Sequence, residues 1–172
     1  MPKSKTRAAE KDAITLLKED HKKIRVLLGE LEETSTRAVD TREELLQTIE
    51  RELKIHAKIE EQIFYPAFRE AAEKQDDKKR YYEALEEHHV VDTVLAELKE
   101  AAPTSDEFAA KAKVLKDLVE HHAEEEETEM FPRARKLMGR HKLLELHDRL
   151  AEAKTSLTEG VLTKLVELVR PS

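Results

Sequence analysis

Two segments of the sequence decide the fold: HAKIEEQIFYP at residues 56–66 and HAEEEETEMFP at residues 122–132. Both read H-A-x-x-E-E and end in an aromatic–proline pair, with the proline ten residues after the histidine. A second pair of segments, EDHKKIRVLLGEL at 19–31 and EEHHVVDTVLAEL at 86–98, aligns without gaps and pairs His21 with His88. The sequence therefore predicts a duplicated helix hairpin, with a histidine on the first helix and His-x-x-x-Glu on the second.

The composition favours helices over sheet. Charged residues make up 40% of the 172-residue chain and apolar residues 39%, while glycine occurs 3 times and proline 5 times. Such a mixture is typical of long helices and contains enough apolar side chains for a core. The absence of cysteine excludes disulfides, thiolate catalysis and cysteine-held zinc or iron–sulfur sites. No apolar run approaches the roughly 20 residues of a membrane span, and we expect a cytoplasmic protein without a secretory signal.

Apolar residues recur at helical spacing in four long segments, so an all-α, antiparallel up-down-up-down four-helix bundle is predicted. Spacings of three and four residues define one buried face on each helix. The predicted faces are Ile14, Leu17, His21, Ile24, Leu28 and Leu31; Leu46, Ile49, Leu53, His56, Glu60, Ile63 and Ala67; Ala84, His88, Val91, Leu95, Leu98 and Ala102; and Phe108, Ala112, Leu115, Val119, His122, Glu126, Met130 and Leu137.

Residue types with strong preferences at helix ends set the predicted boundaries. Asp40 has the residue type of an N-cap for the second helix, and the charged residues 73–80 are expected to form the next connection. The third helix should stop before Pro103, and Thr104 or Ser105 can cap the fourth.

The chain is expected to divide into three parts. Residues 1–11 form a flexible basic tail, residues 12–138 the bundle, and residues 139–172 a C-terminal extension that begins at the helix-ending Gly139. The extension is predicted to be an amphipathic helical segment that packs on the bundle or mediates a homodimer. Its apolar face is formed by Leu143, Leu146, Leu150, Leu157, Val161, Leu165 and Leu168.

Six ionisable side chains occupy positions on the buried faces that otherwise hold apolar residues. An unpaired buried charge costs several kcal/mol and an unsatisfied imidazole about 1–3 kcal/mol, so six such groups need a strong shared partner. A metal centre is the simplest partner, because imidazole nitrogen and carboxylate oxygen are metal ligands. The predicted ligands are His21, His56, Glu60, His88, His122 and Glu126.

The spacing of the ligands suits two metal ions. In His56/Glu60 and in His122/Glu126 the two side chains lie one turn apart on one helix face. The imidazole can bind one ion while the carboxylate bridges toward a second, and six ligands are too many for one tetrahedral ion with an open site. Two His-x-x-x-Glu pairs lack the surrounding motif: His121/Glu125 and His141/Glu145.

The segments DHKKI, HAKIEEQIFYP, EEHH and HHAEEEETEMFP resemble the hemerythrin-like, HHE cation-binding domain over roughly residues 12–150. The resemblance implies a four-helix bundle that holds a non-haem di-iron centre. It also implies that the six predicted ligands bind two iron ions, with Glu60 and Glu126 bridging them and an oxo or hydroxo group as the third bridge. Iron follows from the resemblance alone, because zinc or manganese is compatible with the same ligands.

One position departs from the oxygen-carrying hemerythrins that the chain resembles, which have His-x-x-x-His on the third helix. Here Asp92 stands four residues after His88. Asp92, His89 or Glu87 is then a candidate to complete the site. An open position favours peroxide, nitric oxide or redox chemistry over simple reversible oxygen carriage.

Side chains beside the ligands are expected to support the site. His89 and His121 lie one position off the buried faces, where a helix interface or a hydrogen bond to a ligand is expected. Glu61 and Glu127 point about 100° away from the ligands that they follow, toward solvent or a hydrogen bond with a ligand. Core packing at the end of the site is expected for Phe64, Tyr65 and Phe131. The alternative for Tyr65 is a hydrogen bond or an occasional ligand role.

We expect a metal-binding protein whose two iron ions bind or react with a small oxidant (oxygen, peroxide or nitric oxide), in sensing or stress defence. Binding or sensing is favoured over turnover, because the sequence offers no general base outside the ligands. The alternatives are a metal-dependent enzyme that removes peroxide or nitric oxide, and a non-catalytic helical interaction module. Neither nucleic acid nor a membrane is an expected partner of this chain, whose net charge is −7.

Overall fold

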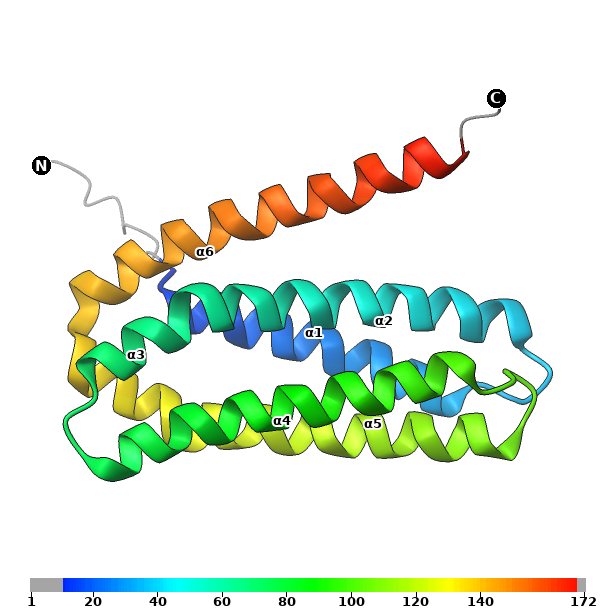
Figure 1. Ribbon diagram of the computed structural model, residues 1–172, viewed down its shortest axis with the longest axis horizontal. Coiled ribbons are helices and arrows are strands. Elements are labelled where there is room, and N and C mark those ends of the chain that lie inside the picture. The colour runs from blue at the N-terminus through cyan, green and yellow to red at the C-terminus, as the bar shows by residue number, and fades with distance from the viewer. Residues whose placement is uncertain (1–10, 170–172) are drawn as a thin grey trace, which may run out of the picture.

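The computed structural model is an antiparallel bundle of four helical rods with an additional helical arm along one side (Figure 1). It describes residues 11–169, with side chains through residue 160. The basic tail predicted for residues 1–11 therefore lies, apart from Lys11, outside the described residues. The same holds for the side chains of Val161, Leu165 and Leu168.

The rods alternate in direction, as predicted. The first is α1 (Ala13–Glu33), and the third is α4 (Gln75–Glu100). The second rod joins α2 (Val39–Ile59), the π-helical turn η1 (Glu60–Phe64) and α3 (Tyr65–Ala71). The fourth joins α5 (Asp106–Glu125), the π-helical turn η2 (Glu126–Met130) and the first part of α6 (Phe131–Val169). In the described part of the chain, no helix has both the length and the apolar character needed to cross a membrane.

The helix ends agree with the sequence at some positions and correct it at others. The Ser105 side chain caps α5 by accepting a hydrogen bond from the Phe108 N–H, as predicted. Asp40, however, is not the N-cap of α2: the helix begins at Val39. The buried guanidinium of Arg42 closes the preceding turn by donating to Thr34, and this contact sets where the helix begins.

The predicted connection over residues 73–80 is shorter in the structure, because α4 already begins at Gln75. Asp77 stabilises this early start: its carboxylate accepts a hydrogen bond from the Lys74 N–H, and Arg133 of α6 donates two more to it. Charge along this stretch reflects the exposed face of a helix rather than a loop.

Two π-helical turns lie at matching positions of the duplicated hairpins, and the sequence did not predict them. The N–H of Tyr65 bonds to the carbonyl of Glu60, and the N–H of Phe131 bonds to the carbonyl of Glu126. Each widened turn is followed, after one residue, by a proline, whose ring and missing N–H disfavour a regular α-helical turn. The added residue rotates the following turn.

This rotation corrects part of the predicted buried face. Ile63 and Ala67 are only partly buried, whereas Phe64 and Phe68 are fully buried in their place. Because a π turn spans one more residue than an α turn, the inward position moves on by one.

Two apolar clusters fill the bundle above and below a layer of buried polar side chains. One cluster includes Ile14, Leu17, Phe64 and Phe68, and the other includes Ile24, about two turns further along α1. The second cluster continues through Leu28, Ile49, Leu95, Leu98, Leu115 and Val119.

Gly139 breaks α6 as expected of a helix-ending glycine. Its φ of 71° and ψ of 173° are non-helical, and the chain turns there into the arm. The arm returns alongside the bundle (Figure 1), and its apolar face packs into the first cluster. The predicted residues Leu143, Leu146 and Leu150 are buried, and Leu157 is partly buried.

Candidate metal centre

The six predicted ligands all lie in the polar layer at the middle of the bundle. Each is buried, with no more than 7% of any residue exposed. Glu60 and Glu126 are the first residues of η1 and η2, so both carboxylates lie at the widened turns. Long-range helix packing brings together residues that the sequence places on four separate rods.

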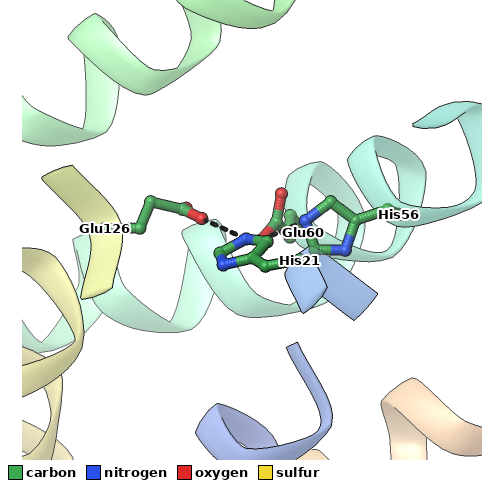
Figure 2. A group of neighbouring side chains, drawn as sticks. All are labelled: His21, His56, Glu60 and Glu126. Atoms are coloured by element: carbon green, nitrogen blue, oxygen red, sulfur yellow. Dashed lines mark ion pairs between the residues drawn. The ribbon is translucent and has the colours of Figure 1, made fainter. Parts of the chain in front are cut away.

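One group of ligand atoms forms around His21 (Figure 2). The carboxylate of Glu126 reaches toward the imidazole of His21 from one side, while Glu60 and His56 approach from the other. His21 Nε2 lies 3.1 Å from Glu126 Oε2 and 4.0 Å from Glu60 Oε1. His56 Nε2 lies 3.2 Å from the same oxygen of Glu60.

A second group forms on the other side of Glu60. Its Oε2 lies 3.3 Å from Nε2 of His88, which in turn lies 3.1 Å from Nε2 of His122. His122 Nε2 is also 3.7 Å from Glu126 Oε2. Both carboxylates therefore contact histidines of both hairpins.

The donor atoms fit a metal site. Four atoms of the first group have no hydrogen-bond partner although they are buried: His21 Nε2, His56 Nε2, Glu60 Oε1 and Glu126 Oε2. One ligand atom from each of these residues lies within 4.8 Å of the others. Buried polar atoms without a partner are costly, and a cation among them would satisfy all four at once.

Each histidine of the centre turns its outer nitrogen, Nδ1, toward a carboxylate. Such contacts orient the ring so that Nε2 faces inward and make it a better metal ligand. Two roles were expected for Glu61 and Glu127, and the structure shows one of them, a hydrogen bond to a predicted ligand. The contacts to Nδ1 are His21 with Glu127 at 2.9 Å, His88 with Glu61 at 2.8 Å, His122 with Glu87 at 2.6 Å and His56 with Asp20 at 3.5 Å.

These four contacts follow the internal duplication. Glu61 and Glu127 both come directly after a His-x-x-x-Glu pair, and Asp20 and Glu87 both come directly before the first histidine of a hairpin. Asp20 was missed by the sequence analysis, although its alignment with Glu87 in the repeated segment could have indicated it.

Tyr65 has the polar role that was the alternative to core packing at this position. Its hydroxyl donates a 2.8 Å hydrogen bond to Glu126 Oε1 and lies 3.3 Å from His88 Nε2 and 3.4 Å from His122 Nε2. Core packing, the expected role, is thus only part of its function. The equivalent residue in the other hairpin is Phe131, which has no hydroxyl and stacks on His21.

The three candidates for an additional ligand differ in position. His89 is exposed, and Asp92 is an exposed residue at the edge of a cavity beside the centre. Glu87 contacts the outer nitrogen of His122 and not the inner one. His121 is exposed and lies 3.2 Å from Glu125, away from the buried groups.

A small cavity adjoins the histidines. It has a volume of about 30 Å³, enough for a water-sized or diatomic molecule. All four histidines of the centre line the cavity together with Asp92. The other lining residues are apolar and include Ile24, Leu53, Val91 and Val119.

The metal-free centre is held together by charge. Burial works against a charged His21, but the nearby carboxylates of Glu126 and Glu127 raise the pKa of this imidazole to about 9. Burial would raise the pKa of Glu126, yet His122 and His21 lower it well below its usual range. Burial, together with the two nearby carboxylates, raises the pKa of Tyr65, so its phenol stays protonated.

Comparisons with known proteins identify similar chains. The family model of the hemerythrin HHE cation-binding domain matches residues 12–134. A solved structure of a hemerythrin HHE cation-binding domain-containing protein from Mycobacterium kansasii is similar, with a TM-score of 0.79 and 27% identity. That match covers 93% of this chain and 95% of the other.

One curated relative is a DNA nickase from Nostoc sp., which is 28% identical over 116 residues. The aligned region covers 67% of this chain but only 31% of the relative, so the chain spans about a third of that protein's length.

Proposed function

The chain belongs to the hemerythrin HHE cation-binding family, and we propose that this metal-binding protein holds two iron ions that react with a small oxidant such as oxygen, peroxide or nitric oxide. The ligands would be His21, His56, Glu60, His88, His122 and Glu126. We further propose that the protein binds or senses the oxidant within a cell.

The number of ions follows from the way in which the ligand atoms divide. His21, His56, Glu60 and Glu126 form one group, while Glu60 forms a second with His88 and His122. Because Glu60 belongs to both groups, its carboxylate would help to hold both ions. Two sites that share a carboxylate are typical of dinuclear centres in helix bundles.

The cavity is the observation that best supports the proposed reaction with a small oxidant. Its size admits a diatomic or peroxide molecule, and all four histidines of the centre are among its lining residues. Iron bound at this centre supplies the electrons for redox chemistry. The chain's own side chains exclude bulk water, because the cavity walls away from the histidines are mostly apolar.

Tyr65 favours a second candidate, the turnover of peroxide. Reducing a peroxide requires protons, and the phenol O–H of Tyr65 is held at the centre by Glu126. A binding protein needs no such donor, so the rate at which the loaded protein consumes peroxide separates the two candidates.

Metal content and the ultraviolet–visible spectrum of the aerobically purified protein test the proposal. We expect about two iron ions per chain and oxo-to-iron charge-transfer absorption in the near ultraviolet, which changes when peroxide or nitric oxide is added. His56→Ala should lower the iron content, whereas the matched control His89→Ala changes an exposed imidazole and should not. A wild-type protein that takes up no iron on loading would contradict the proposal.

A further inference from the structure

The two hairpins of the duplication differ at one pair of equivalent carboxylates, Asp20 and Glu87. Glu87 reaches the outer nitrogen of His122 at 2.6 Å, which is a short hydrogen bond. Asp20, whose side chain is one methylene shorter, stays 3.5 Å from the outer nitrogen of His56. Neither Asp20 Oδ2 nor His56 Nδ1 has a hydrogen-bond partner in the described residues. No hydrogen bond between the two side chains therefore fixes the position of Asp20.

A third residue holds Asp20 in place. The ammonium group of Lys154, on the arm of α6, donates a hydrogen bond to Oδ1 of Asp20. Asp20 is 6% exposed, so its carboxylate lies in the bundle while Lys154 reaches it from outside. Lys154, Asp20 and His56 thus form a chain of contacts from the arm to a predicted metal ligand.

The arm is anchored so that Lys154 faces this point. Leu146 and Leu150 are fully buried against the bundle. Because residues four apart lie on the same helix face, Lys154 stands one turn beyond Leu150 on the docked side. The matched family region ends at residue 134, so Lys154 lies in a part of the chain that the family model does not cover.

We propose that Lys154 is a positioning residue for the metal centre: by holding Asp20 it orients His56, and the C-terminal arm thereby stabilises the ion bound near His21 and His56. This inference rests on the proposed metal function. It makes the two metal positions unequal, because the equivalent carboxylate at the other position, Glu87, hydrogen-bonds to His122 directly. Loss of the contact from Lys154 should therefore lower the affinity for one ion and leave the affinity for the other unchanged.

Titration of the metal-free full-length chain with Co²⁺, followed by visible absorption, tests the proposal. Lys154→Met keeps the aliphatic stem and removes the charge. We expect about a 10-fold weaker affinity for one of two Co²⁺ ions, the lower end of the effect typical of groups that orient ligands. The visible spectrum of that ion should change, while the affinity and spectrum of the other ion should not. Lys154→Arg should restore wild-type affinity for both ions.

Two variants sharpen the test. Lys142→Met is the matched control, since Lys142 is on the same arm but pairs with Glu145, and it should bind both ions as wild type does. In the Asp20→Asn background, Lys154→Met should have no further effect, because Lys154 acts through Asp20.

Three results would overturn the inference. Wild-type affinities and spectra in Lys154→Met would show that the arm does not position the ligand. Equal weakening of both ions, with a lower Tm of the metal-free variant, would identify general packing instead. A wild-type chain that binds neither Co²⁺ nor iron would overturn the proposed function itself.

Discussion

Tyr65 donates its phenol hydrogen to Glu126, a residue 61 positions away on another rod, across 2.8 Å. Phe131 occupies the equivalent position of the other hairpin and has no hydroxyl to donate. The duplicated centre is therefore asymmetric, with a proton-bearing group on the His88 side and an apolar ring stacked on His21.

Removal of this hydroxyl should destabilise the metal-free protein. In Tyr65→Phe, Glu126 Oε1 loses its donor while staying buried, and we expect the free energy of unfolding to fall by about 1–3 kcal/mol. Urea unfolding in the presence of a chelator measures the change. Tyr82→Phe is the control, because Tyr82 is 54% exposed, and its effect should stay within about 0.5 kcal/mol. Equal effects of the two substitutions would show that the hydrogen bond contributes nothing.

Metal removal should lower Tm. A ligand that binds only the folded state at 100 times its Kd stabilises it by about 2.7 kcal/mol, so iron at saturating concentration should give a clear upward shift. Differential scanning calorimetry with and without chelator measures it. His122→Ala, which removes one predicted ligand, should shrink the shift, whereas His147→Ala on the arm should not. Identical melting of the wild type with and without chelator would argue against metal as the partner of the six buried groups.

The metal-free protein should be most stable in mildly acidic solution. The pKa of His21 is raised from 6.5 to about 9, so the stability from its protonated form is complete below pH 6.5 and is lost as the pH rises through 9. A hydrogen bond from His21 lowers the pKa of Glu127 from 4.5 to about 2. Its contribution is present above pH 4.5 and is lost as the pH falls toward 2. The maximum should thus lie between about pH 4.5 and 6.5.

Chemical denaturation of the chelated protein at a series of pH values measures this profile. In His21→Gln the loss of stability on the alkaline side should become smaller, while a His141→Gln control retains it. The metal-loaded protein should instead lose stability already below about pH 6, because its histidine ligands become protonated and release the ions. A flat profile for the chelated wild type would contradict the charged network of the metal-free centre.

Two glycine substitutions should change stability in opposite directions. Gly139 has a φ of 71° and a ψ of 173°, a conformation that side chains disfavour, so Gly139→Ala should cost about 1–3 kcal/mol. Gly29 lies inside α1 with no atom within 4 Å of an added Cβ, and Gly29→Ala should stabilise by about 0.5–1 kcal/mol. Equilibrium unfolding measures both. A neutral Gly139→Ala would mean that the turn into the arm tolerates another conformation.

The four rods and the six clustered side chains could be predicted because their signals are local. Apolar spacing along each helix and the repeated His-x-x-x-Glu segments require no knowledge of the neighbouring rod. The π-helical turns could not be predicted from that periodicity, because one added residue at Glu60 or Glu126 rotates everything that follows. This is why Phe64 and Phe68 are buried instead of Ile63 and Ala67.

The start of α2 shows a further limit of local signals. Asp40 has a strong capping preference, but the contact between Arg42 and Thr34 places the first helical residue at Val39. A buried guanidinium that needs partners for its donors outweighs the preference of one exposed carboxylate for a cap position.

The sequence by itself determined the duplicated hairpin and which histidines and glutamates face the core, because helix periodicity is a property of neighbouring residues. Only the tertiary structure decided which carboxylate meets each outer nitrogen, that Tyr65 bonds to Glu126, and that Lys154 reaches Asp20 from 134 residues away. Those contacts join different rods, so they depend on the rotation and spacing of packed helices, which no single segment encodes.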